Sequence, residues 1–400
     1  MENETPARSD ESFQPAWSGR GRFHSALRVP RFALLMTNPP PWQLVLFHFW
    51  SVLFFTFGSI VGSFLNVCIH RMPRGESIVT PPSHCPQCNY SIPWHLNIPL
   101  VTWLMLGGKC KNCGASISVR YFLVELLTAV LFLSCWLAFG RRLPALAPVY
   151  CLVLAGFIVA TFIDIEHFII PDEITLGGIA AGFVCSFLVP PLQNGAQTAA
   201  LSLERCFAGV IVGAGLVYGI LRLGKLLYGR QRFELAPGSK VFFTETTVKL
   251  PDKEILYEDI FYRKSDAIVL EARTVEMVDR CYNRVPLRLS PARLRVGDES
   301  FNPEEVQHLE VVTDEIVVPR EAMGLGDVKF MAAIGAFLGW QAVIFTLMLS
   351  SIIGATYGLS MIALRKHEWS GRLYFGPFIA LAATIWIFGG DQIARWWLNH

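Results

Sequence analysis

Two aspartates stand where apolar segments meet polar ones. Asp164 follows a long apolar run, and Asp327 ends the sequence Gly324-Leu325-Gly326-Asp327. An ionised side chain near hydrocarbon is costly, so an acid at the edge of a spanning segment is a candidate functional group. Two carboxyls that share a site do not both ionise cheaply: one stays protonated and polarises a peptide carbonyl, while the other activates water as a general base. The pair predicts aspartic protease chemistry at a membrane surface.

Two glycines precede the second aspartate. Gly324 and Gly326 lack a Cβ, which lets an extended substrate backbone approach Asp327. A helix that begins here favours the ionised form of Asp327, so either aspartate is a candidate for the base. A Gly-x-Gly-Asp sequence by itself is also typical of a turn before an Asp N-cap. The chemical interpretation therefore depends on the rest of the chain.

Further charged residues lie close to the two aspartates in sequence. Glu166 and His167 follow Asp164 closely enough to perturb its titration or to cap the loop, and they are also typical of solvated loop residues. Asp172 lies in the same stretch, and Lys329 is placed to pair with an acid. We interpret Glu166 and Asp172 as supporting residues.

Four cysteines form two C-x2-C pairs, Cys85-Pro-Gln-Cys88 and Cys110-Lys-Asn-Cys113. This spacing is typical of a zinc ribbon, in which two knuckles supply four thiolates to one tetrahedral ion. Four cysteine ligands leave no open coordination position, so the predicted zinc is structural and not catalytic. The remaining cysteines lie mostly in apolar runs, and we expect them to be inert: Cys68, Cys135, Cys151, Cys185, Cys206 and Cys281.

The composition is that of a polytopic membrane protein. Of 400 residues, 52% are hydrophobic and 16% are charged, against about 25% charged in soluble proteins. Apolar runs long enough to cross a bilayer, together with one shorter run at 328–339, predict about eight transmembrane helices: 44–66, 121–139, 147–164, 174–193, 206–223, 328–339, 341–364 and 373–398. The net charge is +2 and the basic residues are dispersed, which indicates no nucleic-acid partner.

Residues 229–320 interrupt the apolar pattern. Short alternating stretches separated by Pro-Gly, Pro-Asp and Gly-Asp turns predict a small β-rich soluble insert. It carries no metal or nucleotide motif, so we interpret it as an accessory module. The fold prediction is an all-α polytopic membrane protein with a four-cysteine loop and this β-rich insert, organised as 1–43, 44–120, 121–228, 229–320 and 321–400.

The distribution of Lys and Arg predicts the orientation. Basic residues cluster in the loop 67–120, after the fifth span and at 365–372, which places these stretches in the cytoplasm by the positive-inside rule. Eight spans then put both termini outside. The arginines of the polar tail 1–43, which we expect to be disordered, conflict with this arrangement. Met36, which lies shortly before the first apolar run, is an alternative start codon that removes all of them.

At this point the chain resembles the type IV prepilin leader peptidases, membrane aspartic proteases that also N-methylate the mature pilin. The resemblance spans roughly 55–225 and 320–385. Its motifs occur in the family's order: Gly62 to Pro73, Asn97 to Leu100, Gly108 to Cys110, Ile117 to Tyr121 with Glu125, Asp164 to Asp172, Gly324 to Lys329, and Phe375 to Phe378. The insert 229–320 departs from the family, in which this connection is normally short.

The resemblance implies a function and site residues. Asp164 and Asp327 match the catalytic acids of an endopeptidase that cleaves the basic leader of prepilins or pseudopilins after a glycine. The implied cleavage takes place at the cytoplasmic face of the bacterial inner membrane, near the surface of the lipid bilayer and not at its midplane. S-adenosylmethionine is the implied methyl donor. The chain has no G-x-G-x-x-G fingerprint for it, and the family associates methylation with the zinc-bearing loop, which is intact here.

Other interpretations use the same residues. A proton-coupled transporter would carry protons on Asp164 and Asp327, but it predicts repeated halves with broken helices, and the sequence shows no internal repeat. A peptidase that only cleaves, a zinc-stabilised scaffold with a decayed site, and a presenilin-like protease are further alternatives. The cysteine loop argues against the last of these. Glu125 is expected to pair with Arg120 or a neighbouring helix, and Arg71 to anchor the first span at the headgroups.

Overall fold

The computed structural model describes residues 41–398 except 229, 258–259, 262–265, 307, 320–323 and 365–373. The chain divides into two units, Met1–Leu46 and Phe47–His400, and of the first only the start of one helix is described. That helix begins at Pro41, so positions 41–43 of the predicted disordered tail are helical. The rest of the tail and the basic cluster at 365–372 lie outside the described residues.

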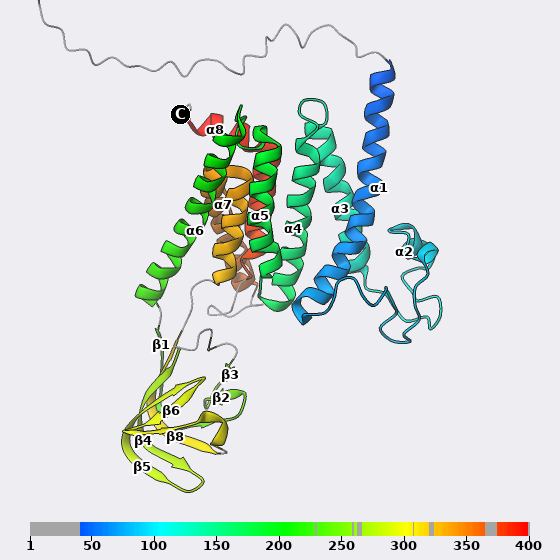
Figure 1. Ribbon diagram of the computed structural model, residues 1–400. Helices are drawn as coiled ribbons and strands as arrows, with labels where there is room; N and C mark the ends of the chain where they lie inside the picture. Colours follow the sequence, from blue (N-terminus) through cyan, green and yellow to red (C-terminus); the bar gives the residue numbers. More distant parts are fainter. Residues whose placement is uncertain are drawn as a thin grey trace, which may run out of the picture. The chain divides into compact units, whose positions relative to one another are not determined.

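Helices account for the apolar part of the chain (Figure 1). In lipid, every backbone N–H and C=O group must find its hydrogen-bond partner within the protein. An apolar run therefore forms a helix, in which all of these bonds lie within one segment. The α-helices are α1 Pro41–Arg71, α2 Val101–Met105, α3 Val119–Phe139, α4 Leu146–His167, α5 Asp172–Leu188, α6 Ala199–Tyr228, α7 Leu325–Ala363 and α8 Gly376–Leu398. Short 3-10 turns occur at Met72–Arg74, Trp94–Leu96, Pro190–Leu192 and Pro303–Glu305.

Five of these helices, α1, α3, α4, α6 and α7, are long and apolar enough to cross a membrane. The predicted number of eight is not confirmed. The segment predicted at 174–193 forms α5, which has 17 residues, and the segments at 328–339 and 341–364 form the single helix α7. Gly339 interrupts α7 with a non-helical backbone (φ 79°, ψ 173°), so this helix contains a kink between the two predicted spans.

Glycines allow α6 and α7 to pack with their backbones in contact. Gly209 and Gly213 form a G-x-x-x-G pattern on α6, and a Cβ at either position would overlap the backbone of α7 at Gly335 or Met331. Small residues at this spacing are typical of close helix pairs in membranes. The contact fixes α7, and with it the start of that helix, against the rest of the bundle.

A second G-x-x-x-G pattern joins α1 to α3. A Cβ at Gly58 would lie 2.9 Å from the Cα of Ala129, and one at Gly62 would lie 2.7 Å from the Cα of Glu125. Here too the absence of a side chain permits the approach. These patterns are visible in the sequence but do not by themselves identify the partner helix.

The insert forms one eight-stranded antiparallel sheet, which confirms the predicted β-rich module. The predicted all-α fold class is therefore not confirmed for the whole chain and holds only for its helical part. The strand order is β3-β2-β1-β8-β4-β5-β6-β7, and a separate hydrophobic core lies on the sheet. The strands are β1 Arg230–Phe243, β2 Thr247–Lys249, β3 Glu254–Leu256, β4 Ile268–Met277, β5 Cys281–Ser290, β6 Arg293–Val296, β7 Glu299–Phe301 and β8 Leu309–Pro319.

The pairing of β1 with β8 is irregular at one point, where Asp314 stabilises the backbone. The register shifts between Glu234 and Ser239, and Gly238 has a positive φ of 82°. The carboxylate of Asp314 accepts a hydrogen bond of 3.0 Å from the backbone N–H of Gly238 and pairs with Arg273. These two interactions hold the pKa of Asp314 below its usual value.

Candidate functional site

Asp164 lies in the last turn of α4. The helix ends at His167, and Phe168 adopts a left-handed conformation whose N–H donates to the Asp164 carbonyl at 2.9 Å. Asp164 is buried, with 6% of the residue exposed. Its Oδ2 accepts a hydrogen bond of 2.9 Å from the backbone N–H of Gly376, the first residue of α8. The carboxyl is therefore held at the positive end of a second helix.

Asp327 lies in the first turn of α7 and is half-buried. Its Oδ2 accepts the backbone N–H of Gly324 at 3.3 Å, so the side chain caps the start of its own helix. The positive end of α7 stabilises negative charge here, as that of α8 does at Asp164. Each aspartate thus has one backbone donor and one helix N-terminus.

The structure brings the two aspartates to the same site. Ile170 is the common neighbour: a Cβ built on Gly326 would lie 3.4 Å from the Cβ of Ile170, and one on Gly376 would lie 3.3 Å from its Cδ1. Both carboxyls therefore lie near Ile170, one held by the start of α7 and the other by the start of α8. Because like charges at close range disfavour double ionisation, the arrangement suits a pair that holds one proton.

Gly376 was not identified from the sequence as a contact of Asp164. It occurred there only within the motif Phe375 to Phe378. A Cβ at this position would lie 2.8 Å from the Oδ2 of Asp164, so the glycine is needed for the close approach of α8. Its position before a proline at the start of an apolar run is the signal that predicts a helix N-terminus here.

Each helix that carries an aspartate forms an ion pair with another helix. Lys329 on α7 pairs with Asp172 at the start of α5 at 2.6 Å, with 38% and 56% of the two side chains exposed. Arg120 on α3 pairs with Glu166 on α4. The expected ion pair of Lys329 is confirmed, and Glu166 pairs with α3 without contacting Asp164. His167 is exposed.

The structure gives Glu125 and Arg71 partners that the sequence did not indicate. Glu125 does not pair with Arg120; its Oε2 accepts the backbone N–H of Leu100 at 2.7 Å, because Arg120 is engaged by Glu166. Arg71 binds the loop that follows α1. Its guanidinium is buried and donates to the carbonyls of Ser77 and Pro81, closing the loop that follows α1.

The four cysteines of the two C-x2-C pairs converge. Their sulfurs all lie within 4.8 Å of one another, with 3.8 Å between Cys85 and Cys113 and 4.0 Å between Cys88 and Cys110. A zinc ion with Zn–S bonds of about 2.3 Å requires S–S separations of about 3.8 Å in a tetrahedron. The donor set and its spacing therefore fit a tetrahedral metal ion.

The two cysteine turns have the same local structure. Asn89 and Gly114 follow the second cysteine of each pair with positive φ angles of 54° and 71°, and each donates its N–H to the carbonyl of the first cysteine at 2.9 Å. The backbone N–H of Tyr90 and the side chain of Asn112 lower the pKa of Cys88. Donors aimed at sulfur favour the thiolate that a metal binds.

Family comparison identifies both halves of the helical part. The model of the Bacterial Peptidase A24 N-terminal domain matches residues 56–139, which include the cysteine loop. The model of the Type IV leader peptidase family matches residues 151–233 and 310–359, which include both aspartates. The chain belongs to the type IV leader peptidase family. The family match breaks off across residues 234–309, which form most of the eight-stranded sheet.

Curated relatives of this family support the assignment. The chain is 29% identical to a prepilin leader peptidase/N-methyltransferase of Aeromonas hydrophila, with 87% of this chain and 93% of the relative covered. It is 27% identical to that of Pseudomonas aeruginosa, covering 86% and 91%. It is 34% identical to that of Dichelobacter nodosus, covering 44% and 67%. A comparison with solved structures gave no match.

Proposed function

We propose that this protein is a membrane aspartic endopeptidase that removes the basic leader of prepilins or pseudopilins, cleaving after a glycine, and that it N-methylates the new N-terminus. Asp164 and Asp327 are the proposed catalytic pair. The observation that carries the proposal is the convergence of these two carboxyls at the N-termini of α7 and α8, in a chain of the type IV leader peptidase family.

The proposed cleavage uses one proton on the pair. The protonated carboxyl donates a hydrogen bond to the scissile carbonyl, and the ionised carboxyl takes a proton from a water molecule as its oxygen attacks the carbonyl carbon. The tetrahedral intermediate collapses when the C–N bond breaks and the leaving amine accepts, from the carboxyl that acted as base, the proton taken from water. Backbone donors from Gly324 and Gly376 hold the carboxyls in place throughout.

The proposed orientation places this site at the cytoplasmic face of the bacterial inner membrane. Both aspartates lie at helix ends, next to polar segments. A prepilin presents its cleavage site where a basic leader stops at the headgroups and an apolar helix begins. Eight crossings are proposed, with α5, α8 and the two halves of α7 completing the set.

We infer that the metal of the cysteine cluster is zinc and that it is structural. Four thiolates in a tetrahedral arrangement fill the coordination sphere, so no position is open to water. Zinc would join the two cysteine turns and thereby order the loop 75–118. Purified protein should contain stoichiometric zinc. Cys85→Ser should lose it, and Cys281→Ser, which changes an exposed cysteine of the insert, should retain it.

The peptidase proposal is tested with a model prepilin in membranes that carry wild type, Asp164→Asn or Asp327→Asn. Each substitution preserves shape and removes one ionisable oxygen, so we expect at least about a hundredfold loss of cleavage. Glu173→Gln changes an exposed carboxylate next to the site and is the matched control. Cleavage that survives in either Asp variant refutes the assignment. Mass spectrometry of the mature N-terminus reports methylation separately.

A further inference from the structure

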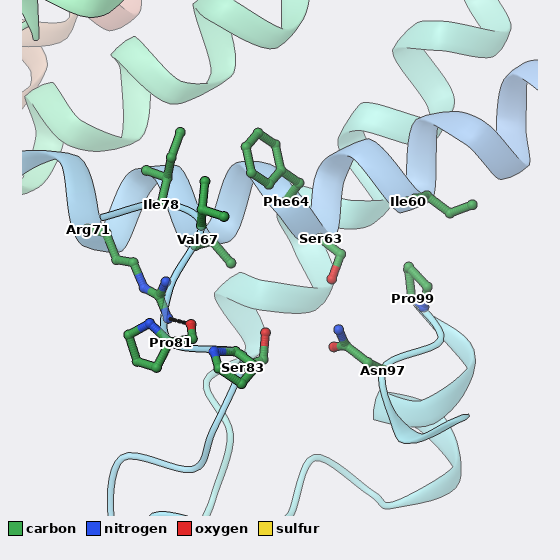
Figure 2. A pocket seen from close by; sticks show the side chains of 12 residues that line it. Ile60, Ser63, Phe64, Val67, Arg71, Ile78, Pro81, Ser83, Asn97 and Pro99 are labelled. Atoms are coloured by element: carbon green, nitrogen blue, oxygen red, sulfur yellow. Dashed lines mark hydrogen bonds between the residues drawn. The ribbon is translucent and has the colours of Figure 1, made fainter. Parts of the chain in front are cut away.

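A cavity lies between α1 and the cysteine loop, apart from the aspartate pair. Its volume is about 300 Å³, at the lower end of the range of about 300–1,000 Å³ that is usual for small-molecule sites. Apolar side chains from α1 and prolines of the loop form most of its wall. Figure 2 shows Arg71 beside Pro81 at one end, and Ser63 and Asn97 near each other at the other.

Arg71 carries a buried charge without a counterion. Only 8% of the residue is exposed, and its guanidinium donates hydrogen bonds to two backbone carbonyls, that of Ser77 at 2.9 Å and that of Pro81 at 2.7 Å. Among the residues that the structure describes, no acidic side chain pairs with it. A buried cation is costly unless an anion compensates it. Three of the five guanidinium donors remain for a ligand. The cavity is therefore suited to a ligand with an anionic end.

Sequence motifs that the cleavage site does not use meet at this cavity. Ser63 and Arg71 belong to the motif Gly62 to Pro73, and Asn97 belongs to the motif Asn97 to Leu100. Glu125 on α3 does not line the cavity, but it contacts both motifs, since it accepts the N–H of Leu100 and lies within hydrogen-bonding reach of Ser63. Peptide hydrolysis by two aspartates explains none of these contacts.

We propose that this cavity binds the methyl donor, an S-adenosylmethionine-type zwitterion. The inference rests on the proposed methyltransferase function and locates its donor site. The carboxylate of the methionine end pairs with Arg71, and the neutral polar groups of the adenosine end lie against Ser63 and Asn97. When bound, the donor supplies a methyl group: its C–S bond breaks as the C–N bond to the pilin amine forms, and the surplus proton leaves to water.

Equilibrium binding to the detergent-solubilised full chain tests the proposal with two ligands. S-adenosylmethionine has the carboxylate, and methylthioadenosine lacks it. In Arg71→Gln we expect Kd for S-adenosylmethionine to rise on the order of tenfold, because a charge-assisted hydrogen bond is lost, and Kd for methylthioadenosine to stay the same. Ser63→Leu, which fills the adenosine end of the cavity, should weaken the binding of both ligands. Arg74→Gln, which lies close to Arg71 in sequence but outside the cavity, should leave the Kd of both ligands unchanged.

The outcomes separate this inference from the proposed function. Variants that keep stoichiometric zinc are folded at the loop. If wild type binds the donor and Arg71→Gln binds both ligands unchanged, the site lies elsewhere and only this inference fails. If wild type cleaves prepilin but binds no S-adenosylmethionine, the methyltransferase function fails with it. A phospholipid that co-purifies with wild type and not with Arg71→Gln, without donor binding, identifies a lipid site and overturns the proposal.

Discussion

Gly376→Ala should impair catalysis while leaving the fold intact. The new Cβ would lie 2.8 Å from the Oδ2 of Asp164, about 0.6 Å short of the 3.4 Å at which ordinary contact begins. The carboxyl must move by a similar amount, and the hydrogen bond from the Gly376 N–H lengthens. Because a misplacement of about 1 Å costs roughly a hundredfold in rate, we expect a loss of about tenfold to a hundredfold.

Gly376→Ala should lower the rate of cleavage without lowering the thermal stability of the protein. Gly376 is the first residue of α8 and does not have a positive φ. Alanine is the better helix former by about 1 kcal/mol or less, so the backbone tolerates the change. Gly389→Ala on the same helix is the control, since its Cβ would meet an ordinary contact at 3.9 Å. Thermal unfolding in detergent should change little in either variant.

Steady-state cleavage of a model prepilin is the assay. A displaced carboxyl lowers kcat, whereas obstruction of substrate entry raises KM with kcat unchanged. The reasoning is refuted if Gly376→Ala retains kcat within about twofold of wild type, a difference of less than about 0.5 kcal/mol in transition-state stabilisation.

Three further predictions concern the supports of the site and the insert. Lys329→Asp should reduce cleavage several-fold by placing two acids together, and Lys329→Asp with Asp172→Lys should recover it, although an exposed pair contributes only about 1 kcal/mol or less. Gly209→Ala should destabilise the bundle in detergent by about 1–3 kcal/mol, because its Cβ overlaps the α7 backbone. Asp314→Asn should lower the hydrogen-exchange protection of β1 and β8 at neutral pH.

Each of these has an internal check. The ion-pair interpretation fails if the double exchange is no better than the single reversal. Gly215→Ala, which meets no neighbour within 4 Å on the same helix, should be as stable as wild type. The folded-state pKa of Asp314 is lowered, so its contribution is complete above the unfolded pKa of about 3.9 and is lost as pH falls through the lower folded value. The difference between Asp314→Asn and wild type should therefore vanish in acid.

Local patterns in the sequence were sufficient for the parts of the protein that are built from near neighbours. Each C-x2-C pair forms its own turn, so spacing alone predicted the four-sulfur cluster. Alternation and turn residues predicted the sheet of the insert, because strands with two distinct faces record burial at every second residue. Both aspartates stand at helix ends, and the change from apolar to polar sequence marked those ends.

The tertiary structure decided which distant groups meet. The N–H of Gly376 that holds Asp164 lies 212 residues away in sequence, and no periodicity relates them. The sequence described Arg120 and Arg71 correctly as basic residues at span ends but not their partners, since pairing depends on how α3 packs on α4 and how the loop folds back. Composition and spacing thus determined the chemistry available, and helix packing determined which atoms share a site.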